Sequence, residues 1–292
     1  MSSTAPIADD PPALPLAELR AQLDRVDDAI HDLLMQRAEV VGHVARLATR
    51  GKVAFRPGRE ADIIRRLLAR HTGALPRRVL PRLWRELFAA TTSMQGPFVV
   101  AVCQRAPAAG FIACAREHFG ALTPLRAHLS PARAIAEVSA GTATVAVLPM
   151  PQEEEPPSAA WWTTLLHQDD PRLHVAARLP FWAPRTEGAS QARALVVAAA
   201  APDASRQDRT LLGFDLPPEM SRARLSAACA GAGLAPAAMI LRRDAAAQTA
   251  QGLIEVDGYI TEDDPRLTAL AEAASRPLVL GAYAVPVEDE TP

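Results

Sequence analysis

The sequence predicts a multidomain protein in which an all-helical segment precedes an alternating α/β segment and a final α+β segment. Three observations lead to this prediction. Apolar residues repeat every seven positions over 16–48, which is typical of a long helix with a partner helix. Patterns of buried strands begin directly after Gly96 and Pro97. From Arg209 onward the patterns follow the order strand, helix, strand, strand, helix, strand.

The composition is that of a globular protein. The chain has 292 residues, of which 49% are hydrophobic and 22% charged, and this length suits two or three domains. The net charge of -2 argues against a nucleic-acid-binding protein. No apolar run approaches the roughly 20 residues that span a bilayer, so no membrane association is expected. The acidic, Pro-rich stretch at 1–15 predicts a disordered lead rather than a signal or transit peptide.

The spacing of the cysteines points to a reducing, cytoplasmic location, and that of the histidines argues against a metal site. The three cysteines are scattered and form no CxxC pair, which argues against a disulfide framework. The seven histidines show no metal-binding spacing, and no Gly-rich phosphate-binding motif is present, so we expect neither a metal nor a cofactor.

The first helix is predicted from about Leu16 to about Ala48, a length of about 50 Å at the rise of an α-helix. Its apolar residues form two heptad rows, one of Leu19, Val26, Leu33, Val40 and Leu47 and the other of Leu23, Ile30 and Val44. A sustained heptad pattern of this kind indicates a partner helix.

Two shorter helices are predicted to follow. Pro57 suits the first position of a helix and Gly73 suits its end. A third helix covers about 76–95, and Pro81 within that stretch favours a later start. The helical domain is therefore predicted over 16–95.

An α/β domain is predicted over 97–204. FVVAV at 98–102 and ATVAVLP at 143–149 have the pattern of buried strands, and the stretch ACAREHFG between them has that of a helix. Trp161 and Trp162 are expected to pack in a core rather than to form a ligand cage.

The last domain is predicted over 206–286. Its elements are the strand RTLLGFDLP, the helix SRARLSAACAGAG, the strands AAMILRR and GLIEVDGYI, the helix DPRLTALAEAA and the strand PLVLGAYAV. This βαββαβ order is typical of a ferredoxin-like fold.

Polar residues interrupt the apolar stripes of the three helices. Arg37 continues the second heptad row at a position where packing favours leucine. Glu60 lies one helical turn before Ile64, on the apolar face of the second helix. The stripe of the third helix continues through Thr91 and Gln95. A buried charge is unfavourable unless a partner pairs with it, so these side chains need partners.

Two interpretations remain open for these residues. They can be structural, with a buried salt bridge such as Arg37–Glu60 and with Thr91 and Gln95 satisfying backbone groups. They can also converge on a pocket for a small polyanion, which we favour because arginines outnumber carboxylates. The distribution of charge supports a polyanion pocket in the helical segment. Residues 16–95 carry 15 Lys and Arg against 9 Asp and Glu, whereas the rest of the chain carries 16 Lys and Arg against 24 Asp and Glu.

These residues belong to motifs that resemble the all-helical class of chorismate mutases. The motifs are LAELRAQLDRVDDAIHDLLMQRAEVV, FRPGREADIIRRLL and LWRELFAATTSMQ, within residues 16–95. They fit the pattern LRxxLDxxDxxIxxLLxxR, then PxRE, then [ST]xxxQ. The resemblance implies an intertwined homodimer with the long first helices side by side, and chorismate, a small dianion, as substrate.

The resemblance implies that four residues hold the two carboxylates of the substrate. Arg20 would reach into the pocket of the partner chain and bind one carboxylate, and Arg37 would bind the other. Arg59 would line the pocket near them, and Thr91 would contact a carboxylate.

The resemblance assigns the reacting part of the substrate to two further residues. Glu60 would accept a hydrogen bond from the ring hydroxyl, and Gln95 would donate to the ether oxygen of the breaking bond. Together with Arg37, these are the expected catalytic residues. The rearrangement to prephenate is unimolecular, so it needs positioning and electrostatic stabilisation rather than a nucleophile.

One position departs from the family pattern. Eleven residues after Arg37 the family places a lysine directed at the same ether oxygen, and here that position is Ala48. Arg46, Arg50 or Lys52 are possible substitutes. Loss of one such donor typically lowers the rate about 100- to 1,000-fold.

The rest of the chain resembles prephenate dehydratase, with a periplasmic-binding-like α/β fold, followed by a regulatory ACT domain. The layout therefore resembles the bifunctional mutase–dehydratase. The family's GTFS is here AGFI at 109–112, its PIENS is PMPQE at 149–153, and its TRF is ARA at 192–194. The effector loop GAL is replaced by EMS at 219–221. We therefore expect a dehydratase-like scaffold that has lost its activity and an ACT-like domain that serves assembly.

The expected function is that of a cytoplasmic, homodimeric chorismate mutase in aromatic amino-acid biosynthesis. Three alternatives stay open: a bifunctional mutase–dehydratase, an isochorismate pyruvate-lyase of similar helical fold, and a non-catalytic regulator of the shikimate pathway, which Ala48 favours. A basic nucleic-acid-binding module is disfavoured because aromatic residues are not interleaved with the basic residues.

Overall fold

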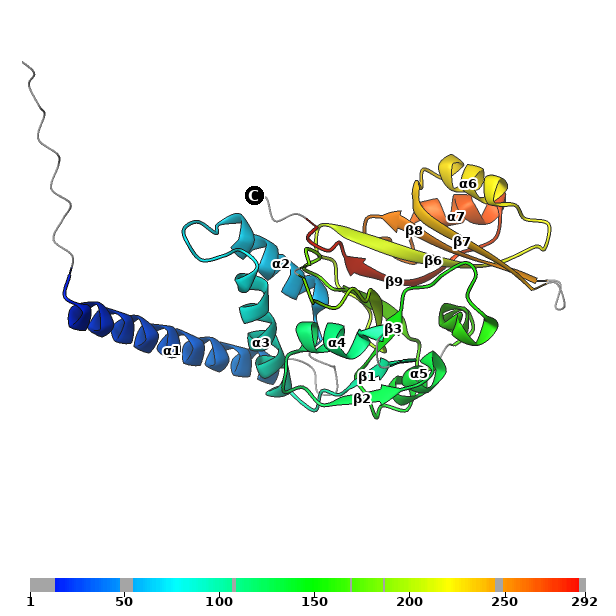
Figure 1. Cartoon of the computed structure of the whole chain (residues 1–292). Coiled ribbons are helices and arrows are strands. Elements are labelled where there is room, and N and C mark those ends of the chain that lie inside the picture. The colour runs from blue at the N-terminus through cyan, green and yellow to red at the C-terminus, as the bar shows by residue number, and fades with distance from the viewer. Residues whose placement is uncertain are drawn as a thin grey trace, which may run out of the picture. The chain divides into compact units, whose positions relative to one another are not determined.

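A computed structural model describes residues 14–47, 55–106, 109–168, 170–185, 187–244 and 249–288. The chain divides into two compact units, Met1–Arg50 and Gly51–Pro292. Figure 1 labels most of the helices and strands of the two units.

The first unit contains the helix α1, Leu16–Leu47. The helix confirms the heptad prediction, and Ala48, its predicted end, lies outside the described residues. None of its residues is buried, and the apolar residues of both heptad rows are exposed, for example Leu23 at 62% and Ile30 at 50%. Within the described part of its own unit, α1 therefore has an apolar face that nothing covers.

The second unit begins with the helices α2, Pro57–Ala69, and α3, Val79–Ser93. Pro57 occupies the first turn of α2, as predicted. Because α3 begins at Val79, Pro81 falls within its first turn, where the missing N–H has no intrahelical acceptor to lose. Both helices pack on the rest of the unit through one core cluster, which comprises Ala61, Ile64, Leu68, Leu80, Phe88, Phe181, Trp182 and Ala284.

The α/β part follows, with β1 and β3 as predicted. Its strands are β1 Val100–Cys103, β2 Leu125–His128, β3 Val145–Pro149, β4 His174–Leu179 and β5 Ala194–Ala198. Its helices are α4 Phe111–Phe119 and α5 Pro131–Ser139, with the short 3₁₀ turns η2 Pro157–Ala159 and η3 Trp161–Leu166. Strands β2 and β3 are parallel to β1, whereas β5 is antiparallel to β3 and β4. Helices α4 and α5 pack against opposite faces of this sheet, because they share different core clusters with β1 and β3.

The segment between β1 and β3 contains more structure than the sequence patterns predicted. One helix was expected there, and the structure has α4, β2 and α5. Trp161 and Trp162 are buried in the core, at 4% and 1% exposure, which confirms their predicted packing role.

The predicted βαββαβ order is confirmed in the last part of the chain. Its elements are β6 Asp208–Leu216, α6 Arg222–Gly231, β7 Pro236–Asp244, β8 Thr249–Asp257, α7 Pro265–Ala273 and β9 Leu278–Ala284. The strands lie in the order β9-β6-β8-β7, with antiparallel neighbours. Residues of α6 and α7 share one core cluster with β6, β7 and β8.

One sheet of nine strands runs through the α/β part and the βαββαβ part, in the order β2-β1-β3-β5-β4-β9-β6-β8-β7. The two parts join where β4 runs parallel to β9, at Val175 and Gly281. A Cβ atom on Gly281 would lie 2.1 Å from the carbonyl oxygen of Val175, and the glycine has a φ of +137°. Glycine is therefore required for the two strands to meet.

Across the described part of the chain, no helix combines the length and the apolarity that crossing a membrane requires.

Candidate functional site

The first turn of α2 presents two of the predicted site residues. Pro57 and Gly58 begin the helix and are buried, and Arg59 is exposed. Glu60 follows with 14% of its side chain exposed. The predicted PxRE helix start therefore places a carboxylate at the border of the core, close to the positive end of the helix dipole.

Glu60 faces an arginine of the neighbouring helix. Arg85 of α3 donates from Nη1 to Oε2 of Glu60 at 2.7 Å, and only 6% of the Arg85 side chain is exposed. Its guanidinium also lies over the rings of Phe88, at 5.9 Å, and Phe181, at 5.3 Å. Burial lowers the pKa of Arg85, and the adjacent Glu60 carboxylate opposes that shift. The ion pair holds the carboxylate of Glu60 in one orientation.

Arg85 is a site residue that the sequence analysis missed. It lies one helical turn before Phe88, at the edge of the apolar stripe of α3. A charged residue at this spacing, opposite a carboxylate on the preceding helix, was the available signal. Arg37 was named as a possible salt-bridge partner of Glu60, and within the second unit Arg85 forms a salt bridge with this carboxylate.

A small hollow lies beside Glu60, with about 260 Å³ of empty space. Its walls are largely aromatic, and the rings of Phe55, Phe98 and Phe119 lie 5.7–5.9 Å apart. The other lining residues are Phe88, Ala89, Thr92, His118 and Thr123. The carboxylate thus lies in a mainly apolar surrounding, which strengthens its electrostatic interactions.

Thr91 makes a hydrogen bond within α3, and Gln95 makes one to α3 from the turn that follows this helix. The hydroxyl of Thr91 donates to the carbonyl oxygen of Leu87 at 2.7 Å. The amide of Gln95 donates from Nε2 to the carbonyl oxygen of Thr91 at 3.1 Å. Both contacts belong to the structural interpretation of these residues, in which side chains satisfy backbone carbonyls of α3.

The predicted site residues fall into the two units. Arg20 and Arg46 are exposed on α1, and Arg37 of the same helix is half-buried. Arg59, Glu60, Thr91 and Gln95 belong to the second unit. Ala48 and two of the possible substitutes for the missing lysine, Arg50 and Lys52, lie outside the described residues.

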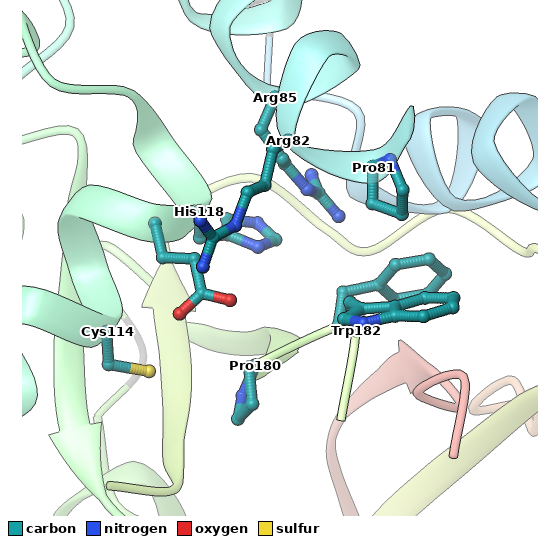
Figure 2. A pocket seen from close by; sticks show the side chains of 9 residues that line it. Pro81, Arg82, Arg85, Cys114, His118, Pro180 and Trp182 are labelled. Atoms are coloured by element: carbon teal, nitrogen blue, oxygen red, sulfur yellow. The ribbon is translucent and has the colours of Figure 1, made fainter. Parts of the chain in front are cut away.

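A second hollow lies between α3 and α4, as Figure 2 shows. Arg82 and Arg85 extend toward it from α3, and Cys114 and His118 extend from α4. Burial raises the pKa of Cys114 to about 12, so its thiol is protonated at neutral pH and is a poor nucleophile. Burial, reinforced by the charge of Arg85, lowers the pKa of His118 well below its ordinary value. Nε2 of His118 has no hydrogen-bond partner among the described residues.

The residues at the eroded dehydratase motifs lie side by side. Ser190 donates from its hydroxyl to the carbonyl oxygen of Gly110 at 2.9 Å, which links the start of α4 to the segment before β5. Arg193 lines an open hollow of about 900 Å³ of empty space, together with Arg178 and Arg185. Arg185 is paired with Glu117, at 2.6 Å. The hollow is basic and polar. The hydroxyl of Ser190, three residues before Arg193 in the chain, was not considered from the sequence.

No group of three His, Cys, Asp or Glu side chains that could hold a metal ion occurs within the described ranges.

Comparison with known proteins agrees with the resemblance of the helical segment. Residues 19–96 match the family model of chorismate mutase type II. The bifunctional chorismate mutase/prephenate dehydratase of Stutzerimonas stutzeri is 30% identical over 142 residues, which cover 46% of this chain and 38% of that protein. The chain thus spans well under half the length of the curated relatives it matches.

Two solved structures align with about two thirds of the chain at low sequence identity. The prephenate dehydratase of Streptococcus mutans is 15% identical, with a TM-score of 0.49 over 65% of this chain and 98% of that chain. GqqA, described as a novel type of quorum quenching acylase, is 19% identical, with a TM-score of 0.48 over 65% of this chain and 95% of that chain.

Proposed function

We propose that this chain is a chorismate mutase, an isomerase that rearranges chorismate to prephenate in the biosynthesis of phenylalanine and tyrosine. The observation that carries the proposal is the chorismate mutase type II match over 19–96, a segment that contains every predicted binding residue. The protein acts in the cytoplasm as a homodimer, without a metal or a cofactor.

The chemistry asks the protein to hold one conformer and to stabilise developing charge. Arg37 binds one carboxylate, and Arg59 and Thr91 support the same end of the substrate. Glu60 accepts the proton of the ring hydroxyl in a hydrogen bond. Gln95 donates to the ether oxygen as the bond to it breaks. Gln95 donates to the carbonyl oxygen of Thr91 in α3, so binding of substrate would require its amide to turn away from that carbonyl.

Arg85 orients the carboxylate of Glu60 in this proposal. The 2.7 Å contact and the burial of Arg85 leave the carboxylate little freedom. A fixed guanidinium of this kind would add to the electrostatic field that favours a dianion.

The homodimer is proposed to form through α1. The apolar residues of both heptad rows are exposed on this helix, although such rows normally pack against a partner helix. Arg20 lies on the same helix and would complete the pocket of the partner chain. Covering the face with a second copy would bury the rows and assemble two sites together.

The C-terminal half is proposed to be a dehydratase-like region without dehydratase activity, followed by an ACT-like unit. The βαββαβ topology supports the ACT-like assignment. The residues in place of the family's TRF lack its threonine, which supports the loss of activity. The bifunctional alternative has one observation in its favour. Ser190 places a hydroxyl beside Gly110, within the stretch that stands in place of the family's GTFS. The non-catalytic regulator keeps its support from Ala48.

The first experiment is to follow the loss of chorismate absorbance with purified protein and to identify the product by chromatography. We expect prephenate and no phenylpyruvate. Arg37→Ala should lower turnover about 100- to 1,000-fold while the protein stays folded. Arg25→Ala, at another arginine of α1 outside the heptad rows, is the matched control and should keep full activity. Full activity of Arg37→Ala would contradict the pocket.

A wild-type protein that binds chorismate without turning it over would support the regulator. Formation of phenylpyruvate from prephenate would support the bifunctional enzyme instead.

A further inference from the structure

Helix α2 does not cap its own N-terminus. Arg56 occupies the cap position and makes no side-chain cap hydrogen bond. The first N–H groups of a helix have no intrahelical acceptor and need one from elsewhere. A distant residue supplies it. Oδ1 of Asp203 accepts from the backbone N–H of Gly58 at 3.0 Å, and Oδ2 accepts from that of Arg59 at 3.1 Å.

The carboxylate of Asp203 suits this position on electrostatic grounds. Its negative charge faces the positive end of the dipole of α2. It also pairs with Nε of Arg56 at 3.2 Å, and 19% of its side chain is exposed. One side chain thus satisfies two backbone donors and one guanidinium at the start of a single helix.

Gly58 lets the backbone of the 203–204 segment approach the helix. A Cβ atom at this position would lie 2.2 Å from the carbonyl oxygen of Asp203 and 3.0 Å from that of Ala204. No other residue type fits there without displacing one of the two segments. Both the backbone and the side chain of Asp203 therefore lie close to the first turn of α2.

A second arginine fastens α2 to the same segment. Nη1 of Arg65 donates to the carbonyl oxygen of Ser205 at 2.8 Å. Nη2 of Arg65 donates to two further carbonyl oxygens, that of Gln207 at 3.1 Å and that of Val285 at 2.6 Å. Ser205 is itself held, because its backbone N–H and its hydroxyl both donate to the carboxylate of Asp208, at 2.8 and 2.6 Å. Residues 203–208 thus connect α2 to the entry of β6.

We propose that Asp203 is a positioning residue for the mutase site, an inference that rests on the proposed function. Asp203 binds the N–H of Arg59 and fixes the first turn of α2, which carries Arg59 and Glu60. It holds that turn against the segment that leads into the βαββαβ unit. Asp203 itself contacts no substrate.

The test compares two helix caps in the same protein. Asp264 caps α7 and accepts from the backbone N–H of Arg266 at 2.9 Å, within the βαββαβ unit. Asp203→Ala and Asp264→Ala each remove one capping carboxylate, so each should lower the melting temperature by a few degrees. Only Asp203→Ala should lower kcat/KM for chorismate, by about tenfold or more, because small displacements of catalytic groups have effects of this size.

Two conservative variants sharpen the test. Asp203→Asn and Asp203→Ser keep an acceptor for the helix and should restore part of the lost activity. Wild-type kinetics in Asp203→Ala would overturn the positioning role, as would an equal kinetic loss in Asp264→Ala.

Hydrogen exchange separates this proposal from the proposed function. Asp203→Ala should speed exchange at the amides of Gly58 and Arg59 and leave the amide of Arg266 unchanged, whether or not the protein turns chorismate over. Unchanged exchange at the first two amides would overturn the cap itself. A wild type without turnover would instead overturn the proposed function and the positioning role, while exchange would still measure the cap.

Discussion

Helices α1 and α2 belong to one predicted helical segment, yet the structure treats them in opposite ways. The 32 residues of α1 include no buried side chain, whereas α2 buries five of its 13 residues. Both helices carry apolar stripes at helical spacing. The difference lies in what each stripe faces. The stripe of α2 packs against residues of the C-terminal half of its own chain, including Phe181 and Trp182, and the stripe of α1 is uncovered within its own unit.

The comparison shows that an amphipathic pattern predicts a buried face but not the source of its cover. For α2 the cover comes from the same chain, and polar contacts from Asp203 and Arg65 fix its position. For α1 we propose that it comes from a second copy. The four predictions below, from the largest expected effect to the smallest, test whether the two helices depend on different partners in this way.

Substitutions on the apolar face of α1 are expected to have the largest effect on activity. The double variant Leu23→Asp/Ile30→Asp places two charges on one heptad row, which should prevent dimerisation and reduce mutase turnover below detection, because the proposed pocket needs Arg20 of the second copy. The unit Gly51–Pro292 should stay folded. All four tryptophans lie in that unit, so their fluorescence reports on it alone. Sedimentation measures the oligomeric state.

Met35→Asp is the matched control for the double variant. Met35 is as exposed as Ile30, at 53% against 50%, and lies outside both heptad rows. The control should remain dimeric and active. An active monomer in the double variant would show that α1 does not supply part of the pocket.

The second effect concerns the ion pair of α2 and α3. Arg85→Met removes the arginine from the Glu60 carboxylate in a largely buried place and should lower the free energy of unfolding by about 3–5 kcal/mol. The double variant Glu60→Gln/Arg85→Met should recover part of this loss, because the side chain at position 60 is then neutral. Urea denaturation followed by tryptophan fluorescence measures both.

Arg82→Met is the control for the pair, since Arg82 lies three residues earlier on α3 and is exposed. It should change stability by less than about 0.5 kcal/mol. An equal loss in both arginine variants would show that the Glu60–Arg85 contact does not matter for folding.

Local sequence patterns predicted the elements and missed the contacts between them. The heptads predicted α1, Pro57 predicted the start of α2, and the alternation after Arg209 predicted the βαββαβ order. The edge strand β2 was missed because it has only four residues and none of them is buried. The pairing of β4 with β9 depends on a contact between Val175 and Gly281, which no local pattern contains.

The same reason explains what was missed at the candidate site. Glu60 was recognised as a carboxylate on an apolar face, but its partner Arg85 is 25 residues away and Asp203, which caps its helix, is 143 residues from Glu60. Arg85 left only the signal of its place at the edge of the apolar stripe of α3, and no local pattern points to Asp203. Thr91 and Gln95 were recognised as a continuation of the apolar stripe of α3, and in the structure both donate hydrogen bonds to backbone carbonyls of α3.

The third effect separates two glycines in helices. Gly58→Ala places a methyl group against the backbone at Asp203 and should lower the free energy of unfolding by about 1–3 kcal/mol. Gly231→Ala, in α6, has no heavy atom within 4 Å of the new Cβ and should be neutral or stabilising by about 0.4–1 kcal/mol. Effects of opposite sign, measured by urea denaturation, are the expected result. A neutral Gly58→Ala would show that α2 can move away from the 203–204 segment.

The smallest effect is a pH dependence on the buried side of α3. Burial and the charge of Arg85 lower the pKa of His118, so this histidine is neutral in the folded protein. In the unfolded chain it takes up a proton below its ordinary pKa of about 6.5. Since the unfolded state then binds more protons, stability falls as pH decreases below about 6.5, by at most about 1.4 kcal/mol per pH unit from this residue. His118→Gln should remove that part of the slope between pH 7 and 5 in urea denaturation. An unchanged slope in His118→Gln would show that the histidine is charged in the folded state.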